Sequence, residues 1–399
     1  MRTSYSLHYK SKRTTKVEFN FLTSPNIIFK RSAHKEIGKY VFGTGKRALI
    51  LHSHSMAGEC LRKMTQSLEE NGIEAFLHEN KSSEPSPDMV DSASDAFKRH
   101  GCDFLIAVGG GSVIDTGKAV CGLVTNGGCL EEYLEGVGTG RKIVNAPVPF
   151  IAMPTTHGTG AEATKNAVIS SREKLYKKSF RDDRLMARKI IVDAELMVSL
   201  PKKQTASCSM DALTQLIEAY TCRKATPLTD ALCISGLKAA ANSILTVYDN
   251  GSDVSAREEM AYASLLSGIC LANAGLGAVH GFAPALGITY DIPHGESCAL
   301  LLDHVMRYNI PYAECKYAHI GEILTGNKYK SAREAAYAGA DYVSDLKKHM
   351  LIQPDLKHLD IADNDIKNII SRLSTNSMGA NPVQMSEEQI RDFIISLRR

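Results

Sequence analysis

Short apolar runs alternate with helical patterns over the first half of the chain. The runs are rich in aliphatic side chains and are bounded by polar residues or glycine, as buried strands are. They lie at residues 47–54, 73–79, 103–111 and 149–156. The helical patterns between them lie at residues 56–72, 88–101 and 112–124. This order predicts a parallel sheet with helices on both faces.

After about residue 200 the strand pattern stops, and long segments with helical spacing of apolar residues follow. They lie at residues 201–221, 228–249, 256–277, 331–350 and 386–399. Several begin with a capping or acidic residue, as Ser386 precedes Glu387 and Glu388. We therefore predict two domains, an α/β domain over residues 1–199 and an all-helical domain over residues 200–399.

Composition and charge narrow the class of protein. The 47 basic and 44 acidic residues give a net charge of +3, and neither a dense basic patch nor tryptophan is present, which argues against nucleic-acid binding. No run approaches the roughly 18 apolar residues of a membrane span. The ten cysteines form no CxxC pair, as is typical of reduced thiols. We expect a cytoplasmic protein with no nucleic-acid or membrane partner.

The N-terminal sixteen residues are basic. They carry Arg2, Lys10, Lys12, Arg13 and Lys16 and no acidic residue, together with several Ser and Thr. This composition faintly resembles an organelle transit peptide. The alternative, which we favour, is an exposed basic segment ahead of the first strand.

The segment VGGGSVID, residues 108–115, follows a predicted strand and opens a predicted helix. Its glycines let the backbone approach a ligand closely, and a helix N-terminus presents free N–H groups and the positive end of the helix dipole. A pyrophosphate fits these features. The segment does not match GxGxxG, so the usual Rossmann topology does not follow, and a tight strand–helix turn is the alternative.

A second loop, PTTHGTGAEATKNAVI, covers residues 154–169. Thr155, Thr156 and Thr159 offer hydroxyl groups, while Gly158 and Gly160 remove bulk. At the carboxyl end of a sheet that already has a phosphate loop, such a segment can hold phosphate, ribose or nicotinamide.

Two further segments offer metal ligands. In MDALTQLIEAY, Asp211 and Gln215 are one helical turn apart on one face. His280 and His294 lie in a later segment rich in small residues, where the chain can turn back on itself. One carboxylate and two imidazoles could hold a divalent ion, whereas the alternative is a pair of hydrogen-bonded core histidines.

Together these motifs resemble the iron-containing (group III) alcohol dehydrogenase family. GGGSVID, PTTHGTGAE, DALTQLIEAY, GAVHGFAPALG and IPHG occur in its order and spacing, over roughly residues 20–395. The resemblance implies an α/β dinucleotide-binding domain with a parallel sheet, followed by an all-helical domain. It also implies a nicotinamide cofactor and a divalent metal in the cleft between them, hydride transfer between an alcohol and its aldehyde or ketone, and a homodimer.

The resemblance assigns roles to individual residues. The pyrophosphate loop is Gly109, Gly110, Gly111 and Ser112, and the second cofactor loop contains Thr155, Thr156 and Thr159. Asn166 and Lys177 would reach the cofactor ribose, with Lys178 as a rival for the second position. Asp211, His280 and His294 match three of four ligands to a metal, Fe²⁺ or Zn²⁺, and His280 is also a candidate catalytic residue.

The fourth ligand departs from the family pattern. Gln215 stands where a histidine is usual, and Pro284 stands where many members carry a further histidine. We favour ligation by the Gln215 amide oxygen, with weaker affinity for Fe²⁺ or Zn²⁺, and polarisation of the substrate oxygen by the metal. The alternatives are a metal-independent reductase in which Gln215, His280 and His294 bind the substrate, a Gln215 that bonds only within the helical domain, and a degenerate cofactor-binding protein. Glycerol dehydrogenases and dehydroquinate synthase share the fold by resemblance, but the motifs fit the alcohol dehydrogenases better.

Two residues outside these motifs bear on catalysis and cofactor choice. His157, where the family often has a small residue, either faces the nicotinamide as a proton relay or lies on a surface loop. Ser53 should lie near the adenine ribose, flanked by His52 and His54. Because no carboxylate stands there to repel a 2′-phosphate, we expect NADP, or both NAD and NADP.

Overall fold

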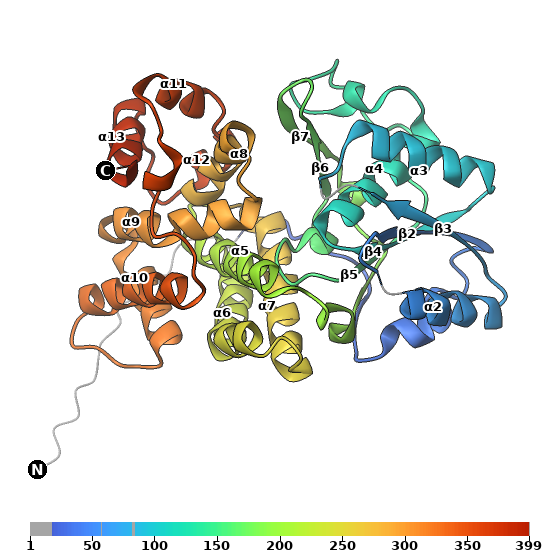
Figure 1. Ribbon diagram of the computed structural model, residues 1–399, viewed down its shortest axis with the longest axis horizontal. Coiled ribbons are helices and arrows are strands. Elements are labelled where there is room, and N and C mark those ends of the chain that lie inside the picture. Colours follow the sequence, from blue (N-terminus) through green and yellow to red (C-terminus); the bar gives the residue numbers. More distant parts are fainter. Residues whose placement is uncertain (1–17, 57, 82–83, 399) are drawn as a thin grey trace, which may run out of the picture.

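The computed structural model describes residues 18–56, 58–81 and 84–398, which form two domains side by side (Figure 1). The basic N-terminal segment, and with it the choice between its two interpretations, lies outside these residues. A six-stranded sheet forms the centre of the first domain, in the order β1-β8-β5-β4-β2-β3 with every pairing parallel. Its strands are β1 (Ile27–Phe29), β2 (Arg47–Ser53), β3 (Glu74–Asn80), β4 (Phe104–Gly109), β5 (Phe150–Pro154) and β8 (Lys189–Val192).

Alternation of side chains along the buried strands creates two apolar layers. In β4, Phe104, Ile106 and Val108 join one buried cluster, while Leu105 and Ala107 join the other. The helices that cover the sheet are α1 (Ile37–Val41), α2 (Gly58–Glu70), α3 (Pro87–Arg99) and α4 (Gly111–Asn126). Helices α3 and α4 lie on one face and α2 on the other (Figure 1). The predicted α/β domain with a parallel sheet is confirmed.

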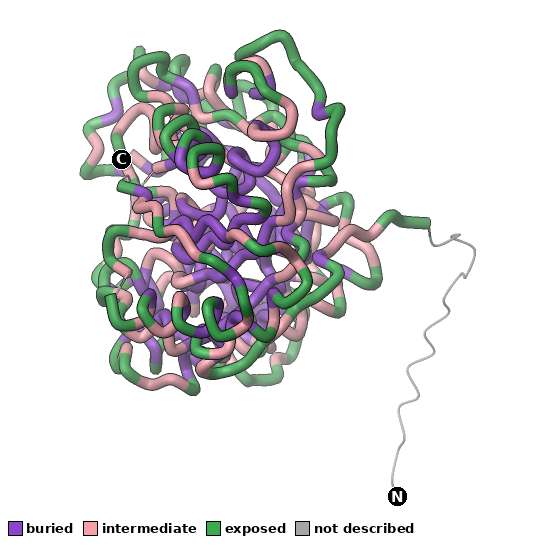
Figure 2. The backbone as a smooth tube through the Cα atoms, turned by 90° about the vertical axis from the view of Figure 1, so that its right-hand side faces the viewer, coloured by how far each residue is buried: buried purple, intermediate pink, exposed green. Residues whose placement is uncertain are grey.

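The second domain is helical, as predicted. It contains α5 (Lys202–Thr221), α6 (Pro227–Asp249), α7 (Val254–Ala274), α8 (Ala278–Tyr290), α9 (His294–Thr325), α10 (Ala332–His349), α11 (Asp363–Ser371), α12 (Thr375–Ala380) and α13 (Glu387–Arg398). Helices α9, α11 and α12 were not among the predicted segments, and in α9 Pro311 interrupts the helical pattern. Buried residues run through the middle of the molecule (Figure 2). We keep the boundary at residues 199 and 200 as a prediction.

Four strands of the first domain were not predicted. Strands β1 and β8 have three and four residues, which is too short for a periodic pattern to stand out. An antiparallel hairpin, β6 (Asn166–Ser171) and β7 (Tyr176–Arg181), follows the second cofactor loop. The glycines and threonines before β6 led us to treat this region as loop, whereas its buried Ala167, Ile169 and Phe180 pack on the sheet domain.

Helix α6 qualifies the expectation about membranes. Among the helices described, it is long and apolar enough to cross one, with a mean hydropathy of 1.3 over its best window, of which 44% is buried. Helices α7 and α8 meet the same test only as a pair bent by 102°. Helix α6 packs against α5, α7 and α9 and buries Cys233, Leu237 and Ala240, as a core helix of the second domain does.

Glycine contacts join the two domains. The segment after β5 presses Gly160 against Gly268 of α7 and Gly158 against Cys208 of α5. A Cβ at position 268 would lie 2.2 Å from the Gly160 carbonyl oxygen, and Gly160 itself has a φ of +58°. Only glycine at both positions allows this approach without strain. These contacts fix the second cofactor loop against α7 and against α5, the helix that carries Asp211.

A methyl group placed in this contact tests its importance. We expect Gly268→Ala to lower the free energy of unfolding by about 1–3 kcal/mol, because an overpacked site must shift backbone atoms. Urea unfolding followed by circular dichroism measures the change. Gly379→Ala, on α12, is the matched control, since a Cβ there meets nothing within 4 Å in the described part of the chain. Equal midpoints for the two variants would contradict the prediction.

Candidate active site

The start of α4 is built to receive an anion. Gly110 is its N-cap and supplies no side-chain cap, and the first turn holds no acidic residue. The N–H groups of a helix's first turn point along the positive end of the helix dipole, where an anion can bind. Ser112 lies in the same turn and accepts a hydrogen bond from Asn80 Nδ2 at 3.2 Å. The geometry matches the predicted pyrophosphate loop.

The two predicted cofactor loops lie against each other. Cβ atoms built on Gly110 and Gly111 would lie 3.1 Å from Thr156 and 2.9 Å from Thr159. The Thr155 N–H donates to the Gly109 carbonyl at 3.0 Å. The glycines thus make room for the threonines, and both loops lie at the carboxyl ends of the neighbouring strands β4 and β5, where open parallel sheets bind ligands.

Hairpin β6–β7 carries the two predicted ribose residues. Asn166 begins β6, and its carbonyl accepts from Lys118 Nζ at 2.8 Å, which ties the hairpin to α4. Lys177 is partly buried and its Nζ lies 2.9 Å from Glu84 Oε2, whereas Lys178 is exposed. The charge of Lys177 also acts on His294. Lys177 therefore faces the site, and its rival Lys178 faces away.

The end of β2 differs from the expectation that no carboxylate lies there. Ser53 ends the strand, and the pairing of β2 with β3 brings in Glu79. The Glu79 carboxylate lies 2.8 Å from Nδ1 of His54. Position along the chain identifies only Ser53 and its neighbours on β2, whereas this acidic residue comes from the neighbouring strand.

Asp211, His280, His294 and Cys298 bring their donor atoms together. These atoms all lie within 4.8 Å of one another, in a group drawn from α5, α8 and α9. Asp211 Oδ1 is 3.2 Å from His280 Nε2 and 3.8 Å from His294 Nε2. Asp211, His280 and Cys298 are buried, while the His294 side chain is 31% exposed. One carboxylate and two imidazoles around a common point suit a divalent cation.

Burial and the neighbouring side chains shift the pKa of every residue in this group. Burial alone would raise the pKa of Asp211. That pKa is nevertheless below its usual value, because the imidazoles of His294 and His280 attract the carboxylate and His280 and Gln215 donate hydrogen bonds to it. Burial also opposes a charge on His280, but Cys298, Asp211 and Glu218 raise its pKa well above the usual value. Burial, opposed by Asp211, lowers the pKa of His294 to about 4. The same desolvation raises the pKa of the Cys298 thiol to about 12.

Gln215 has the opposite orientation to the one predicted. Its amide oxygen accepts a hydrogen bond from Ser267 Oγ at 2.7 Å. Its amide nitrogen donates to Asp211 Oδ1 at 3.1 Å and to the Thr159 carbonyl at 3.3 Å. Two acceptors at that end require the NH₂ group there. In this arrangement Gln215 supports Asp211, and its amide oxygen faces Ser267.

Glu218 is a site residue that the sequence reasoning missed. Its carboxylate lies 2.6 Å from His280 Nδ1 and accepts the Val279 N–H at 2.6 Å and the His280 N–H at 3.4 Å. It thus caps α8, whose N-cap Gly277 has no side chain to do so, and leaves His280 Nε2 facing Asp211. Glu218 is seven residues after Asp211 on α5, a spacing that could have revealed it.

His157 is not a surface histidine. It is fully buried, and its Nε2 lies 3.1 Å from Ser209 Oγ of α5. Burial and the charge of Arg257 lower its pKa to about 3. The imidazole is therefore neutral at physiological pH, which argues against the predicted proton relay.

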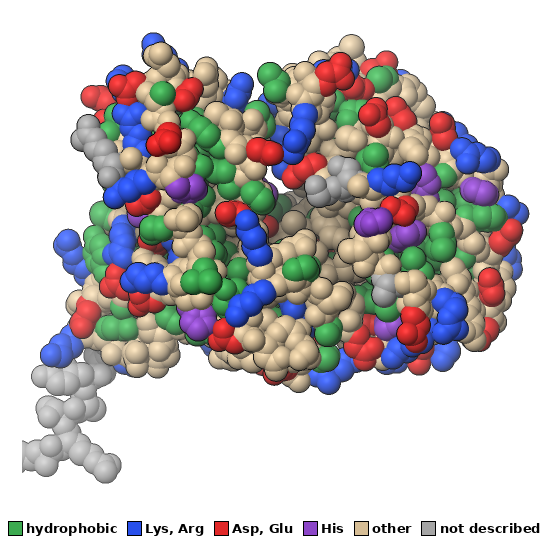
Figure 3. Space-filling view, viewed as in Figure 1, with side chains coloured by type: hydrophobic (Ala, Val, Ile, Leu, Met, Phe, Trp, Pro, Cys, Tyr) green, Lys and Arg blue, Asp and Glu red, His purple; other side chains and the backbone are tan. Residues whose placement is uncertain are grey.

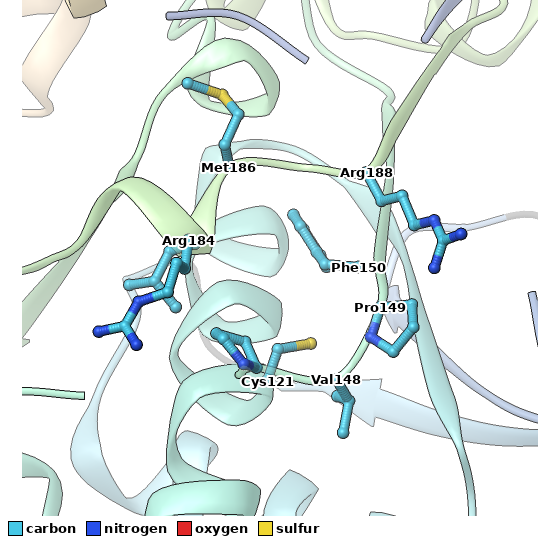
Figure 4. A pocket seen from close by; sticks show the side chains of 9 residues that line it. Cys121, Val148, Pro149, Phe150, Arg184, Met186 and Arg188 are labelled. Atoms are coloured by element: carbon cyan, nitrogen blue, oxygen red, sulfur yellow. The ribbon is translucent and has the colours of Figure 1, made fainter. Parts of the chain in front are cut away.

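The surface is hollowed between the two domains (Figure 3). A separate pocket of about 160 Å³ lies beside the start of β5, where Cys121, Phe150, Arg184 and Arg188 line it (Figure 4). That is the amino end of the strand, opposite the glycine and threonine loops. Because ligands of parallel sheets bind at the carboxyl ends, we place the active site between the domains.

A helix start suited to a phosphate, beside a group of candidate metal ligands, is typical of one class of protein, the metal-assisted dinucleotide oxidoreductases. Residues 24–194 match the family model of iron-containing alcohol dehydrogenase, and residues 205–397 match the model of the C-terminal region of that family. The chain belongs to the iron-containing alcohol dehydrogenase family and is an oxidoreductase.

Named relatives agree. The NAD-dependent methanol dehydrogenase of Bacillus methanolicus is 36% identical over 77% of this chain and 80% of its own length. The lactaldehyde reductase of Escherichia coli K12 is 34% identical over 86% of this chain and 90% of its own. The crystal structure of a 1,3-propanediol oxidoreductase superimposes with a TM-score of 0.88 at 31% identity, covering 95% of this chain and all of that one. NAD and a divalent metal are the cofactors that these relationships support.

Loss of the Glu218 carboxylate should weaken metal binding. We expect Glu218→Gln to reduce affinity for Zn²⁺ about 10- to 100-fold, because residues that orient a ligating histidine have effects of that size. Competition with a chromophoric chelator measures the affinity. Glu259→Gln, at an exposed position of α7, should leave it unchanged. Equal affinities for both variants would show that Glu218 does not act on the metal site.

Proposed function

We propose that this protein interconverts a small alcohol and its aldehyde or ketone with NAD, with the substrate oxygen bound at a divalent cation that Asp211, His280 and His294 hold. An unbroken series of contacts carries the proposal. The Thr159 side chain fits against Gly111 of the phosphate loop. The Thr159 carbonyl accepts from Gln215, which also donates to Asp211. One residue thus joins the cofactor loop to the metal ligands.

Each element has a part in the reaction. The first turn of α4 binds the pyrophosphate, and Thr155 and Thr156 line the path from that turn toward the cleft. Glu218 holds His280 with Nε2 toward the centre, and Gln215 does the same for Asp211 Oδ1. The partly exposed His294 forms the open side, where substrate enters. A bound cation supplies Lewis-acid polarisation of the substrate oxygen, and the nicotinamide exchanges the hydride.

Assays of NADH oxidation before and after removal of the metal test this function. We expect NADH oxidation on addition of small aldehydes, loss of that activity after chelation, and its return with Fe²⁺, Zn²⁺ or Co²⁺. Asp211→Asn should lower kcat at least about 1000-fold, because Lewis-acid polarisation contributes several kcal/mol. Asp345→Asn, an exposed change on α10, is the control.

The outcomes separate the alternatives. Full activity with negligible metal content would indicate the metal-independent reductase. NADH binding without turnover across a panel of aldehydes and ketones would indicate the degenerate cofactor-binding protein.

Glu79 favours NAD over NADP, contrary to the preference inferred from sequence. A carboxylate at the end of β2 and β3 repels a 2′-phosphate. We expect Glu79→Gln to raise the ratio of kcat/KM for NADPH to kcat/KM for NADH about 5-fold, since an exposed charge contributes up to about 1 kcal/mol. Glu74→Gln, at the opposite end of β3, is the matched control. A wild-type preference for NADPH would contradict the assignment.

The choice between Fe²⁺ and Zn²⁺, the homodimer and the cytoplasmic location stay predictions. Among these, Zn²⁺ is the metal we propose, because a thiol stands among the donors and a borderline-soft cation accepts it.

A further inference from the structure

Helix α9 offers the metal centre a second donor. His294 is the first residue of the helix, and Cys298 follows one turn later on the same face. The Cys298 side chain is fully buried, and its Sγ lies 3.7 Å from His280 Nε2 and 3.9 Å from His294 Nε2. A buried cysteine is usually a small apolar side chain. Here its sulfur points at two imidazole nitrogens.

The separations between these donor atoms are close to the edges of a coordination tetrahedron, except the one between Asp211 and His294, which is longer. With bonds of about 2.3 Å to sulfur and about 2.0–2.1 Å to nitrogen, tetrahedral angles place sulfur and nitrogen about 3.6 Å apart. The two observed separations, 3.7 and 3.9 Å, are close to that value. The same geometry places two nitrogen or oxygen donors about 3.3 Å apart. Asp211 Oδ1 and His280 Nε2 are 3.2 Å apart, and Asp211 Oδ1 and His294 Nε2 are 3.8 Å apart.

We propose that Cys298, and not Gln215, is the fourth protein ligand of the metal. This inference rests on the proposed metal-assisted function and adds to it. Gln215 turns its NH₂ group to Asp211 and the Thr159 carbonyl, while Pro284 of α8 has no donor at all. Cys298, on α9, supplies the donor that neither Gln215 on α5 nor Pro284 on α8 supplies. On binding the cation the thiol gives up its proton to solvent and ligates as thiolate.

A thiolate changes the charge and the preference of the site. Asp211 and Cys298 together carry two negative charges, which balance a divalent cation, whereas a carboxylate with three imidazoles would leave one positive charge. Sulfur is a softer donor than an imidazole or an amide oxygen, so the set favours Zn²⁺ or Co²⁺ over hard cations such as Mg²⁺ and Mn²⁺. The ligands can still open to a fifth position for substrate, as catalytic zinc sites do.

Cobalt spectroscopy tests the ligand directly, without recourse to activity. The full chain is stripped with a chelator and reloaded with one equivalent of Co²⁺. We expect visible bands of a four-coordinate cobalt site and a near-ultraviolet thiolate-to-cobalt charge-transfer band. Cys298→Ser should lose the charge-transfer band and bind Co²⁺ more than about 10-fold more weakly, the lower limit seen even for residues that only orient a ligand.

Matched variants separate the candidates. Cys121→Ser removes another buried thiol, far along α4, and should keep the band. Gln215→Leu should also keep it, because its amide is not a ligand. A band that persists in Cys298→Ser, or that is absent from Gln215→Leu loaded with saturating Co²⁺ while Cys298 is intact, overturns the assignment.

X-ray absorption on the unmutated Zn²⁺ protein gives a second test that does not depend on the folding of any variant. We expect one sulfur at about 2.3 Å among nitrogen and oxygen neighbours. Stoichiometric zinc without a sulfur neighbour would overturn the role of Cys298 and leave the metal-assisted function in place. A protein that binds neither Co²⁺ nor Zn²⁺ would overturn both.

Discussion

The site depends on the close approach of a glycine-rich loop to two helices. The segment after β5 reaches α7 through Gly160 and Gly268, and α5 through Gly158 and Cys208, with backbone atoms touching. A side chain in either contact would push the sheet domain away from the helical domain. The cofactor loops belong to the first domain and the metal ligands to the second. Their distance, on which hydride transfer depends, is therefore set by four residues that have no chemical role themselves.

Helix α5 carries three polar residues of the site next to that contact. Asp211, Gln215 and Glu218 occupy one side of a nearly fully buried helix, where a polar group without partners would cost about 1–3 kcal/mol or more. Their partners come from other elements: Asp211 and Glu218 contact the start of α8, and Gln215 contacts α7 and the Thr159 loop. Because each polar group is satisfied only when the helices and the loop are in place, folding itself orients the donors.

The sequence predicted what depends on periodicity and motif, and failed where three-dimensional pairing decides. Strands β2 to β5 and the loops around Gly110 and Thr156 lie where expected, since alternation and glycine content reflect local requirements, whereas the short β1 and β8 were missed. Glu79 escaped notice because it reaches the end of β2 only through strand pairing. The orientation of Gln215 could not be read either, since it follows from acceptors on Thr159 and Asp211 that are distant or ambiguous in sequence. His157 seemed free in a loop, and only the packing against α5 shows it buried.

The role of Gln215 beside Asp211 depends on the role of Cys298 as a metal ligand. If Cys298 supplies the fourth donor, a third imidazole at position 215 would compete with it for the same cation. A glutamine instead donates to Asp211 Oδ1, whose remaining lone pair stays available for the metal. The glutamine also accepts from Ser267, so neither end of its amide is left buried without a partner. A neutral donor beside the carboxylate holds it in place without adding charge, and the thiolate provides the negative charge that the usual histidine lacks. Gln215, which departs from the family pattern, is therefore compatible with a thiolate ligand from Cys298 in the same site.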